Sequence, residues 1–273
     1  MNGWNSTGDL LERTTSIVTG STRGIGAEIA KHLASVGSSV VISGRTVEEG
    51  KQVVEQISEA GGNAVFIQTD VRDSDDLQQL TETAIGEFGG IDILVNNAAY
   101  ETDTTPDEIE LDTWNAILET DFRAYWLTAK YAYPSLIESD YGSIVNIGSN
   151  HAVATQPKKF PYNALKAGID GMTKSMAVAW GVDGIRTNSV NPGWTMVERI
   201  IEELSSEELA EFEHIHPLGR IGLPEDVANT VIFLASNLSD FITGECIIVD
   251  GGRTVVLQDD LYLRDVGRKS GKY

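Results

Sequence analysis

The stretch Thr19-Gly20-Ser21-Thr22-Arg23-Gly24-Ile25-Gly26 indicates the fold, because a predicted strand precedes it and a predicted helix follows it. The segment Ser16-Ile17-Val18 before it has the character of a buried strand, and residues 27–36 after it have helical character. Strand, glycine-rich turn and helix in this order are typical of a dinucleotide-binding turn. The first glycine allows the tight turn, the second lets the backbone approach a pyrophosphate, and the third lets the helix pack close to the sheet. The helix N-terminus would then offer N–H groups to the phosphates, although a ligand-free βα turn would look the same.

The second predicted strand, Ser39–Ser43, ends in Gly44-Arg45. A site that prefers NAD usually carries an acidic residue about 20 positions after the glycines, to hold the ribose 2′-hydroxyl. This chain has Arg45 there instead, and Arg23 lies inside the turn. Two guanidinium groups suit a 2′-phosphate, since arginine binds phosphate in a bidentate fork. The pattern predicts NADP(H) over NAD(H), and two solvated surface arginines are the alternative.

Tyr162 and Lys166 lie four residues apart, thirteen and seventeen residues after Ser149. On a helix this spacing places both side chains on one face. An ammonium held beside a phenol favours the phenolate and lowers its pKa from about 10. Such a phenol can exchange a proton near neutral pH, as an alcohol/carbonyl interconversion requires. The pair alone is a weak signal, and Ser149 could equally be a strand-end serine that bonds to backbone.

These segments and several others resemble the short-chain dehydrogenase/reductase family over about residues 12 to 252. The matching motifs are Thr19–Gly26, Asp70-Val71, Asn96-Asn97-Ala98-Ala99, the serine strand Gly142–Ser149, Tyr162 with Lys166, Asn191-Pro192-Gly193-Trp194-Thr195, Pro217–Ala228, Ile242-Thr243-Gly244 and Val249–Gly252. The resemblance implies a single α/β domain, doubly wound and Rossmann-like, with about seven parallel strands and helices on both faces.

The resemblance also assigns roles. It implies Tyr162 as the general acid/base, Lys166 as the group that lowers its pKa and holds the nicotinamide ribose, and Ser149 as the partner of the substrate oxygen. The cofactor-binding residues that it implies are Gly20, Ser21, Thr22, Arg23, Gly24, Ile25, Gly26, Arg45, Asp70, Val71, Asn97, Ala98, Tyr162, Lys166, Pro192, Gly193 and Thr195. Asn150, His151 and Trp194 are expected to border the substrate, with Glu101 and Glu198 as less certain neighbours.

One position departs from the family pattern. Family members usually carry an asparagine in the helix after the Asn-Asn-Ala motif, where it helps to hold a water relay to the lysine. Alignment of residues 114–123 places Asp121 at that point. Its backbone carbonyl could hold the same water, and its carboxylate, if ionised, would raise the pKa of Lys166. Asp121 is therefore a weaker catalytic candidate.

Composition limits the partners. The 273 residues carry 20 Lys and Arg against 41 Asp and Glu, a net charge of −21. Such a surface repels nucleic acid and anionic membranes, so neither is expected as a partner. Self-repulsion of this size favours a setting where salt screens it, which predicts a halophilic protein. No leader or membrane-length apolar run is evident, and the single cysteine, Cys246, fits a reducing cytoplasm.

The chain is expected to form one domain over residues 1–273, with a C-terminal tail at 253–273 that packs on a neighbouring subunit or is disordered. Residues 198–213 are expected to form a substrate-covering helix, which is either a lid or an ordinary amphipathic helix. His214 and His216 do not share a helix face, so solvated loop histidines are expected there, and no metal site is expected anywhere in the chain.

The leading hypothesis is an NADP(H)-dependent oxidoreductase for a secondary alcohol or hemiacetal and its carbonyl, on a monosaccharide or polyol. A 3-oxoacyl thioester reductase would share every motif, although the acidic surface counts against an acyl-carrier partner. A non-catalytic NADP-binding regulator is the third hypothesis. From the resemblance we expect a homotetramer or dimer, formed partly through residues 226–235 and 241–249.

Overall fold

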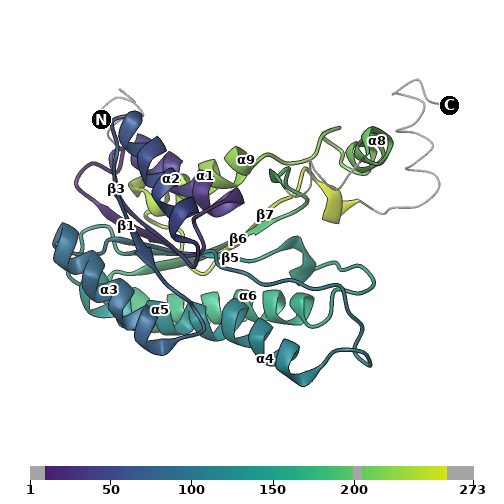
Figure 1. Cartoon of the computed structure of the whole chain (residues 1–273), viewed down its shortest axis with the longest axis horizontal. Coiled ribbons are helices and arrows are strands. Elements are labelled where there is room, and N and C mark those ends of the chain that lie inside the picture. Colours follow the sequence, from purple (N-terminus) through teal and green to yellow (C-terminus); the bar gives the residue numbers. More distant parts are fainter. Residues whose placement is uncertain (1–9, 199–204, 257–273) are drawn as a thin grey trace.

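The computed structural model describes residues 10–198 and 205–256, and Figure 1 shows strands and helices alternating along them. The strands are β1 (Thr15–Val18), β2 (Ser39–Gly44), β3 (Asn63–Gln68), β4 (Ile93–Asn96), β5 (Ser143–Ile147), β6 (Arg186–Pro192) and β7 (Cys246–Val249). The α-helices are α1 (Gly24–Ser35), α2 (Val47–Glu59), α3 (Ser74–Phe88), α4 (Leu111–Leu118), α5 (Ala124–Leu136), α6 (Tyr162–Trp180), α8 (Ser206–His214) and α9 (Pro224–Ala235).

The seven strands form one parallel sheet in the order β3-β2-β1-β4-β5-β6-β7, which confirms the predicted doubly wound fold. At its centre Ser16 of β1 pairs with Val40 of β2 on one side and with Ile93 of β4 on the other. The chain moves outward from β1 to β3 and then returns to build the sheet in the other direction from β4. The reversal between β1 and β4 is the topological switch point at which such sheets bind ligands.

Helices cover both faces of the sheet, with α1, α2 and α9 on one side and α3, α5 and α6 on the other (Figure 1). Alternate residues of each strand enter opposite cores, because successive side chains point to opposite faces. Val18 thus packs in the core beneath α1 and α9, whereas its neighbour Ile17 packs in the core beneath α3 and α5. Burial on both faces explains why the strands are continuous apolar runs rather than alternating ones.

The segment expected to form a substrate-covering helix over 198–213 is only partly described, since residues 199–204 lie outside the described residues. The described helix α8 begins at Ser206, where the Ser205 side chain accepts from the Glu208 backbone N–H in a capping box. Residues 257–273, most of the predicted tail, also lie outside the described residues. None of the helices in the described ranges has the length and apolar composition needed to cross a membrane.

Candidate active site

The glycine-rich turn after β1 lies against the end of β4, and two glycines make this approach possible. Gly20 has a φ of +63°, and a Cβ added there would lie 2.7 Å from the Ala98 Cα. A Cβ at Gly26 would lie 2.4 Å from both the Gly20 carbonyl oxygen and the Asn97 side-chain nitrogen. Any larger residue at either position would therefore push the turn away from the sheet.

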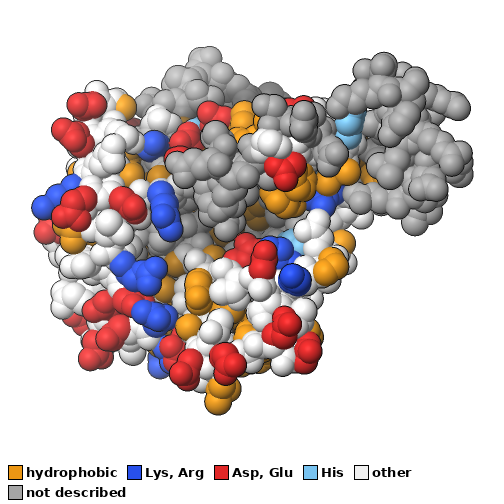
Figure 2. All heavy atoms as spheres, turned by 45° about the vertical axis from the view of Figure 1, so that its right-hand side comes forward, with side chains coloured by type: hydrophobic (Ala, Val, Ile, Leu, Met, Phe, Trp, Pro, Cys, Tyr) orange, Lys and Arg blue, Asp and Glu red, His pale blue; other side chains and the backbone are white. Residues whose placement is uncertain are grey.

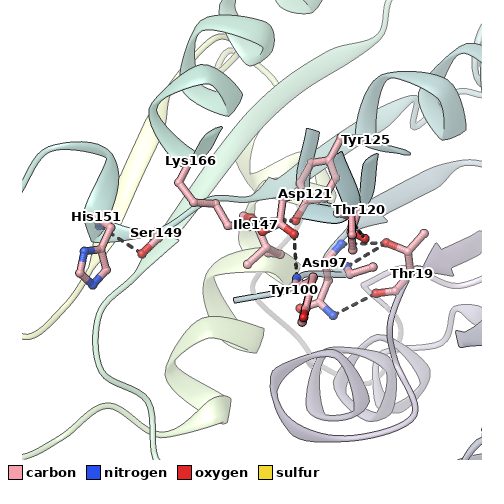
Figure 3. A network of polar contacts seen from close by, with 12 residues as sticks. Thr19, Asn97, Tyr100, Thr120, Asp121, Tyr125, Ile147, Ser149, His151 and Lys166 are labelled. Carbon is pink, nitrogen blue, oxygen red and sulfur yellow. Dashed lines mark hydrogen bonds and ion pairs between the residues drawn. The ribbon is translucent and has the colours of Figure 1, made fainter. Parts of the chain in front are cut away.

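Thr19 and Asn97 tie this turn to β4. The Thr19 hydroxyl accepts the backbone N–H of Asn97 at 2.9 Å, and the Asn97 side chain donates to the carbonyls of Thr19 and Gly20, each at 2.9 Å. Figure 3 shows the two residues joined by these bonds. Asn97 is expected among the cofactor-binding residues, but its side-chain amide donates its N–H groups to the glycine-rich turn and holds the turn in shape. Thr19 was not singled out as a site residue from the sequence.

The start of α1 can receive a phosphate. Its N-cap residue Arg23 is extended, and within the described part of the chain no side chain caps the helix, so the first-turn N–H groups are available. Arg23 and Arg45 are both exposed at this edge of the sheet. The predicted nicotinamide dinucleotide fits this arrangement, because the glycines leave room for it and the free N–H groups with the two nearby arginines would hold its phosphates.

Two carboxylates also lie on this side of the site. Glu49 of α2 accepts a hydrogen bond from the Thr22 hydroxyl at 2.9 Å, a contact that the sequence did not indicate. Asp70, at the end of β3, pairs with Arg72 at 2.6 Å, and that arginine holds the pKa of the carboxyl below its usual value. Val71 is buried in the core beneath α3.

Tyr162 and Lys166 both lie on α6, as predicted, with Tyr162 as its first residue. Lys166 is only 1% exposed, and its Nζ lies 5.3 Å from the centre of the Tyr162 ring. The same Nζ donates to the Ile147 carbonyl oxygen at 3.1 Å, at the end of β5. Tyr125 of α5 completes this buried group, since its hydroxyl donates to the same carbonyl and lies 3.4 Å from the lysine Nζ.

The expected lowering of the Tyr162 pKa is wrong for this structure. Burial raises the pKa of Tyr162 well above 10, the charge of Glu101 raises it further, and only the hydrogen bond with Ser149 lowers it. The Lys166 ammonium, 5.3 Å from the centre of the Tyr162 ring, is bound to other partners and does not offset this burial. Burial in turn lowers the pKa of Lys166.

Asp121 is one of those partners. It lies in a π-helical turn, Glu119–Arg123, between α4 and α5, and is fully buried. Its Oδ1 accepts the Tyr100 backbone N–H at 2.7 Å, and its Oδ2 lies 3.5 Å from Lys166 Nζ (Figure 3). Burial raises the pKa of Asp121, while the charge of Asp121 raises that of Lys166, the direction predicted from the sequence. An extra residue in a helical turn of this kind is frequent at functional sites.

Ser149 follows β5 and is 5% exposed. Its hydroxyl accepts the His151 backbone N–H at 3.1 Å and interacts with Tyr162, so the structure brings Ser149, Tyr162 and Lys166 together. The His151 ring stands edge-on to the Tyr162 ring, with 5.9 Å between their centres. Asn150 is buried, and its amide lies 3.5 Å from the Asp250 carboxylate. Asn150 and His151 line a cavity of about 250 Å³.

The segment after β6 forms another wall of the candidate active site. Trp194 stacks on Phe212 of α8 with ring centres 4.2 Å apart, which joins the Pro-Gly turn to that helix. Gly193 donates its N–H to the Val249 carbonyl, and Thr195 is buried with its hydroxyl on the Gly193 carbonyl. Glu198 is exposed.

Glu101, expected as a less certain neighbour, lies close enough to Tyr162 to act on its pKa. It is held there by Lys159, whose Nζ lies 2.5 Å from Glu101 and 2.8 Å from Asp103.

His216 differs from its prediction as a solvated loop histidine. It is 2% exposed, and its Nδ1 lies 2.6 Å from the Phe212 carbonyl, which makes this nitrogen the N–H donor. Within the described residues no hydrogen-bond partner reaches the buried Nε2. The turn that follows α8 carries this ring inward, against Gly251.

Comparison with known proteins agrees with this geometry. Residues 20–254 match the family model described as enoyl-(acyl carrier protein) reductase. The chain is 35% identical over 250 residues, 91% of its length and all of the relative, to cis-4-hydroxycyclohexanecarboxylate dehydrogenase of Sinomonas cyclohexanicum. It is 37% identical over 89% of its length, and 98% of the relative, to the 3-oxoacyl-[acyl-carrier-protein] reductase FabG of Aquifex aeolicus.

A solved structure of a candidate gluconate dehydrogenase from Agrobacterium tumefaciens superposes with a TM-score of 0.86 at 30% identity, over 92% of this chain and all of that one. The chain belongs to the short-chain dehydrogenase/reductase family. It is an oxidoreductase for alcohol and carbonyl groups, and proteins of this family use a nicotinamide cofactor, NAD or NADP.

Proposed function

We propose that the protein is an NADP(H)-dependent oxidoreductase that interconverts a secondary alcohol, or a hemiacetal, and its carbonyl on a monosaccharide or polyol. The observation that carries this proposal is the meeting of Ser149, Tyr162 and Lys166 beside a small polar cavity. The side chains of Asn150, His151, Thr155 and Gln156 offer that cavity hydrogen-bonding groups. A hydroxylated substrate of a few carbons suits such a lining better than a steroid or a long acyl chain.

The proposed chemistry assigns each residue of the group one task. When bound, the nicotinamide cofactor supplies or accepts the hydride at the reacting carbon. The Ser149 hydroxyl donates a hydrogen bond to the substrate oxygen, and Tyr162 transfers a proton to or from the same oxygen. Because burial raises its pKa, Tyr162 favours the protonated phenol, which donates in the reductive direction, and in the oxidative direction it accepts the proton as the phenolate. Lys166, held by Asp121 and the Ile147 carbonyl, adds positive charge beneath the phenol.

The preference for NADP(H) rests on Arg23 and Arg45, both exposed where the adenosine ribose is expected. Their guanidinium groups suit a 2′-phosphate. Glu49 lies on the same side, bound to the Thr22 hydroxyl, and its charge opposes a phosphate. Asp70 is already paired with Arg72. Arg23 and Arg45 therefore outnumber the remaining acid, Glu49, which supports NADP(H) over NAD(H).

The names of two relatives agree with a small hydroxylated substrate, since gluconate and hydroxycyclohexanecarboxylate each carry a hydroxyl on a short carbon skeleton. The 37% identity to a 3-oxoacyl-[acyl-carrier-protein] reductase favours a thioester substrate as the second candidate. Docking of an acyl-carrier protein would need a basic patch, and a net charge of −21 counts against such a patch.

We also propose that the protein self-associates as a homotetramer or dimer in a high-salt setting. Phe241, between α9 and β7, is fully exposed, which supports a covering partner on that side. Acidic side chains are spread over the face shown in Figure 2, in line with the net charge.

The test is the absorbance of NADPH in molar KCl, with NADP⁺ and a panel of sugars and polyols, and with NADPH and a 3-oxoacyl thioester. Oxidation of one sugar or polyol supports the proposal. Turnover of the thioester alone moves the function to the second candidate while leaving Ser149, Tyr162 and Lys166 in their roles. Tight NADPH binding without turnover of any compound would favour the regulator.

A further inference from the structure

A single arginine lines the cavity beside the candidate active site. After β7 the chain turns through Gly251 and Gly252 into a short 3-10 helix, Arg253–Val255. The polar residues around the cavity of about 250 Å³ are Asn150, His151, Thr155, Gln156, Arg253 and Thr254. The cavity therefore joins the loop after Ser149 to the segment after β7, two parts of the chain about 100 residues apart in the sequence. Figure 1 shows the segment after β7, in yellow, on the same side of the molecule as α8.

The charge of Asp250 acts on Arg253, but the two side chains form no direct ion pair in the described part of the chain. Over the described ranges no carboxylate forms an ion pair with this guanidinium and no hydrogen bond reaches it. The acid beside it, Asp250, is already occupied, since it accepts the backbone N–H groups of Gly252 at 3.0 Å and Thr254 at 2.9 Å. Partial burial lowers the pKa of Arg253 and the charge of Asp250 raises it, so the guanidinium has lost part of its hydration beside one nearby acid.

His151 connects this arginine to the reacting centre. Its ring is edge-on to the Tyr162 ring at 5.9 Å, and its Nδ1 lies 3.0 Å from the Thr155 hydroxyl on the cavity wall. Burial lowers the pKa of His151, and the charge of Arg253 is near enough to lower it further. His151 thus borders both the cavity that Arg253 lines and the Tyr162 ring.

We propose that Arg253 binds a carboxylate on the substrate, so that the substrate is a small hydroxy acid rather than a neutral sugar. This inference rests on the proposed function and narrows its substrate class. A guanidinium with free N–H groups presents a planar fork that matches the two oxygens of a carboxylate. A fixed carboxylate would orient the chain of the substrate so that one hydroxyl-bearing carbon reaches Ser149 and Tyr162.

The carboxylate of the substrate takes no part in the chemical step. In the oxidative direction the substrate carbon loses its hydrogen as a hydride to NADP⁺, the hydroxyl proton passes to the phenolate form of Tyr162, and the secondary alcohol becomes a ketone. The carboxylate keeps its charge throughout and serves only for binding. A sugar phosphate would also carry an anionic group for the arginine, so the test includes one.

The experiment compares D-gluconate with D-glucitol, an uncharged polyol with the same number of carbons, as substrates with NADP⁺. We measure kcat/KM for the wild type, Arg253→Gln, Arg253→Lys and Arg13→Gln. Arg13 is exposed and precedes β1, at the opposite edge of the sheet, so R13Q removes the same charge far from the cavity. Melting temperature and NADPH affinity verify that each variant is folded.

We expect R253Q to lower the ratio of kcat/KM for gluconate over glucitol by about tenfold to a hundredfold, mainly through KM, because the guanidinium fork is lost. R253K should restore part of the ratio, since it keeps the charge without the fork, and R13Q should leave it as in the wild type. Equal ratios in the wild type and R253Q would overturn the inference. Turnover of glucitol would in that case still support the proposed function. Dependence on Arg253 for D-glucose 6-phosphate but not for gluconate would also overturn it.

Calorimetric binding of gluconate to the NADP⁺-loaded protein separates the two proposals if no compound is turned over. Binding by the wild type that weakens at least tenfold in R253Q but not in R13Q would support the carboxylate site even though the proposed function had failed. Binding that is absent, or equal in the two proteins, would overturn the site.

Discussion

Lys166 Nζ lies 3.5 Å from the Asp121 Oδ2, and both side chains are at most 1% exposed. A buried ion pair of this kind is costly to break because the remaining charge is left in a medium of low polarity. The carboxylate and the Ile147 carbonyl together hold the ammonium beside the Tyr162 ring. The pair is the main way in which this chain departs from the family pattern at its active site.

Replacement of Asp121 by asparagine should shift the pH dependence of the reaction. Asp121 raises the pKa of Lys166, so its loss lowers that pKa and lets the ammonium lose its proton at lower pH. If the reaction needs the ammonium, the alkaline limb of the kcat/KM profile of D121N moves down by about one pH unit. Asparagine keeps an oxygen for the Tyr100 N–H, so folding should survive.

The matched control for this variant is Asp140→Asn, an exposed acid before β5 at the far edge of the sheet. The profile of D140N should overlay that of the wild type. An unmoved alkaline limb in D121N would show that Asp121 has no electrostatic influence on the reaction.

Replacement of Arg45 by aspartate should reverse the cofactor preference. A carboxylate at the end of β2 repels a 2′-phosphate and accepts a hydrogen bond from a free ribose 2′-hydroxyl. We expect the KM for NADP⁺ to rise at least about tenfold in R45D while that for NAD⁺ falls or stays constant. Steady-state kinetics with both cofactors measure this, and a wild type that already prefers NAD⁺ would refute the role of Arg45.

The net charge of −21 predicts that salt stabilises the fold. The Debye length falls from about 10 Å at 0.1 M to about 3 Å at 1 M salt, which screens repulsion between surface acids. We expect the melting temperature to be about 5 °C or more higher in molar KCl than in dilute buffer. Sucrose of equal osmolality strengthens burial without screening charge, so an equal rise in sucrose would count against the electrostatic explanation.

Acid should destabilise the protein through His216. Burial lowers the pKa of His216 in the folded state below the ordinary value near 6.5, so its stabilising contribution is complete above that value. The contribution is lost as pH falls through the folded pKa, since a proton on the buried Nε2 would have no partner among the described residues. The melting temperature should therefore fall below about pH 6.5, and less steeply in His216→Gln. His214→Gln, two residues away, should follow the wild type.

The fold could be predicted from the sequence because its decisive signals are local. The glycines of residues 19–26 and the apolar run before them determine a βα unit, and the parallel order follows from repetition of that unit. Strand β2 begins at Ser39, as the sequence indicated, and ends at Gly44. Tyr162 and Lys166 could be predicted as a pair because residues four apart on a helix lie on the same face.

The remaining features depend on contacts between distant segments, which spacing does not encode. The direction in which Lys166 points is set by Asp121 and Tyr125, about 40 residues earlier in the chain. His216 appeared to be a loop residue, and the turn after α8 carries it inward. Arg253 was counted as part of a tail, and only the fold brings it beside His151.

The most direct test of the central claim is the activity of Tyr162→Phe, measured with NADP⁺ and the best substrate of the wild type, together with the affinity for NADPH. Phenylalanine keeps the ring and removes only the proton-bearing hydroxyl. The account predicts a fall in kcat of about a hundredfold to ten-thousandfold with little change in NADPH affinity. A variant that keeps the wild-type kcat would contradict the assignment of Tyr162 as the acid/base, and with it the proposed chemistry.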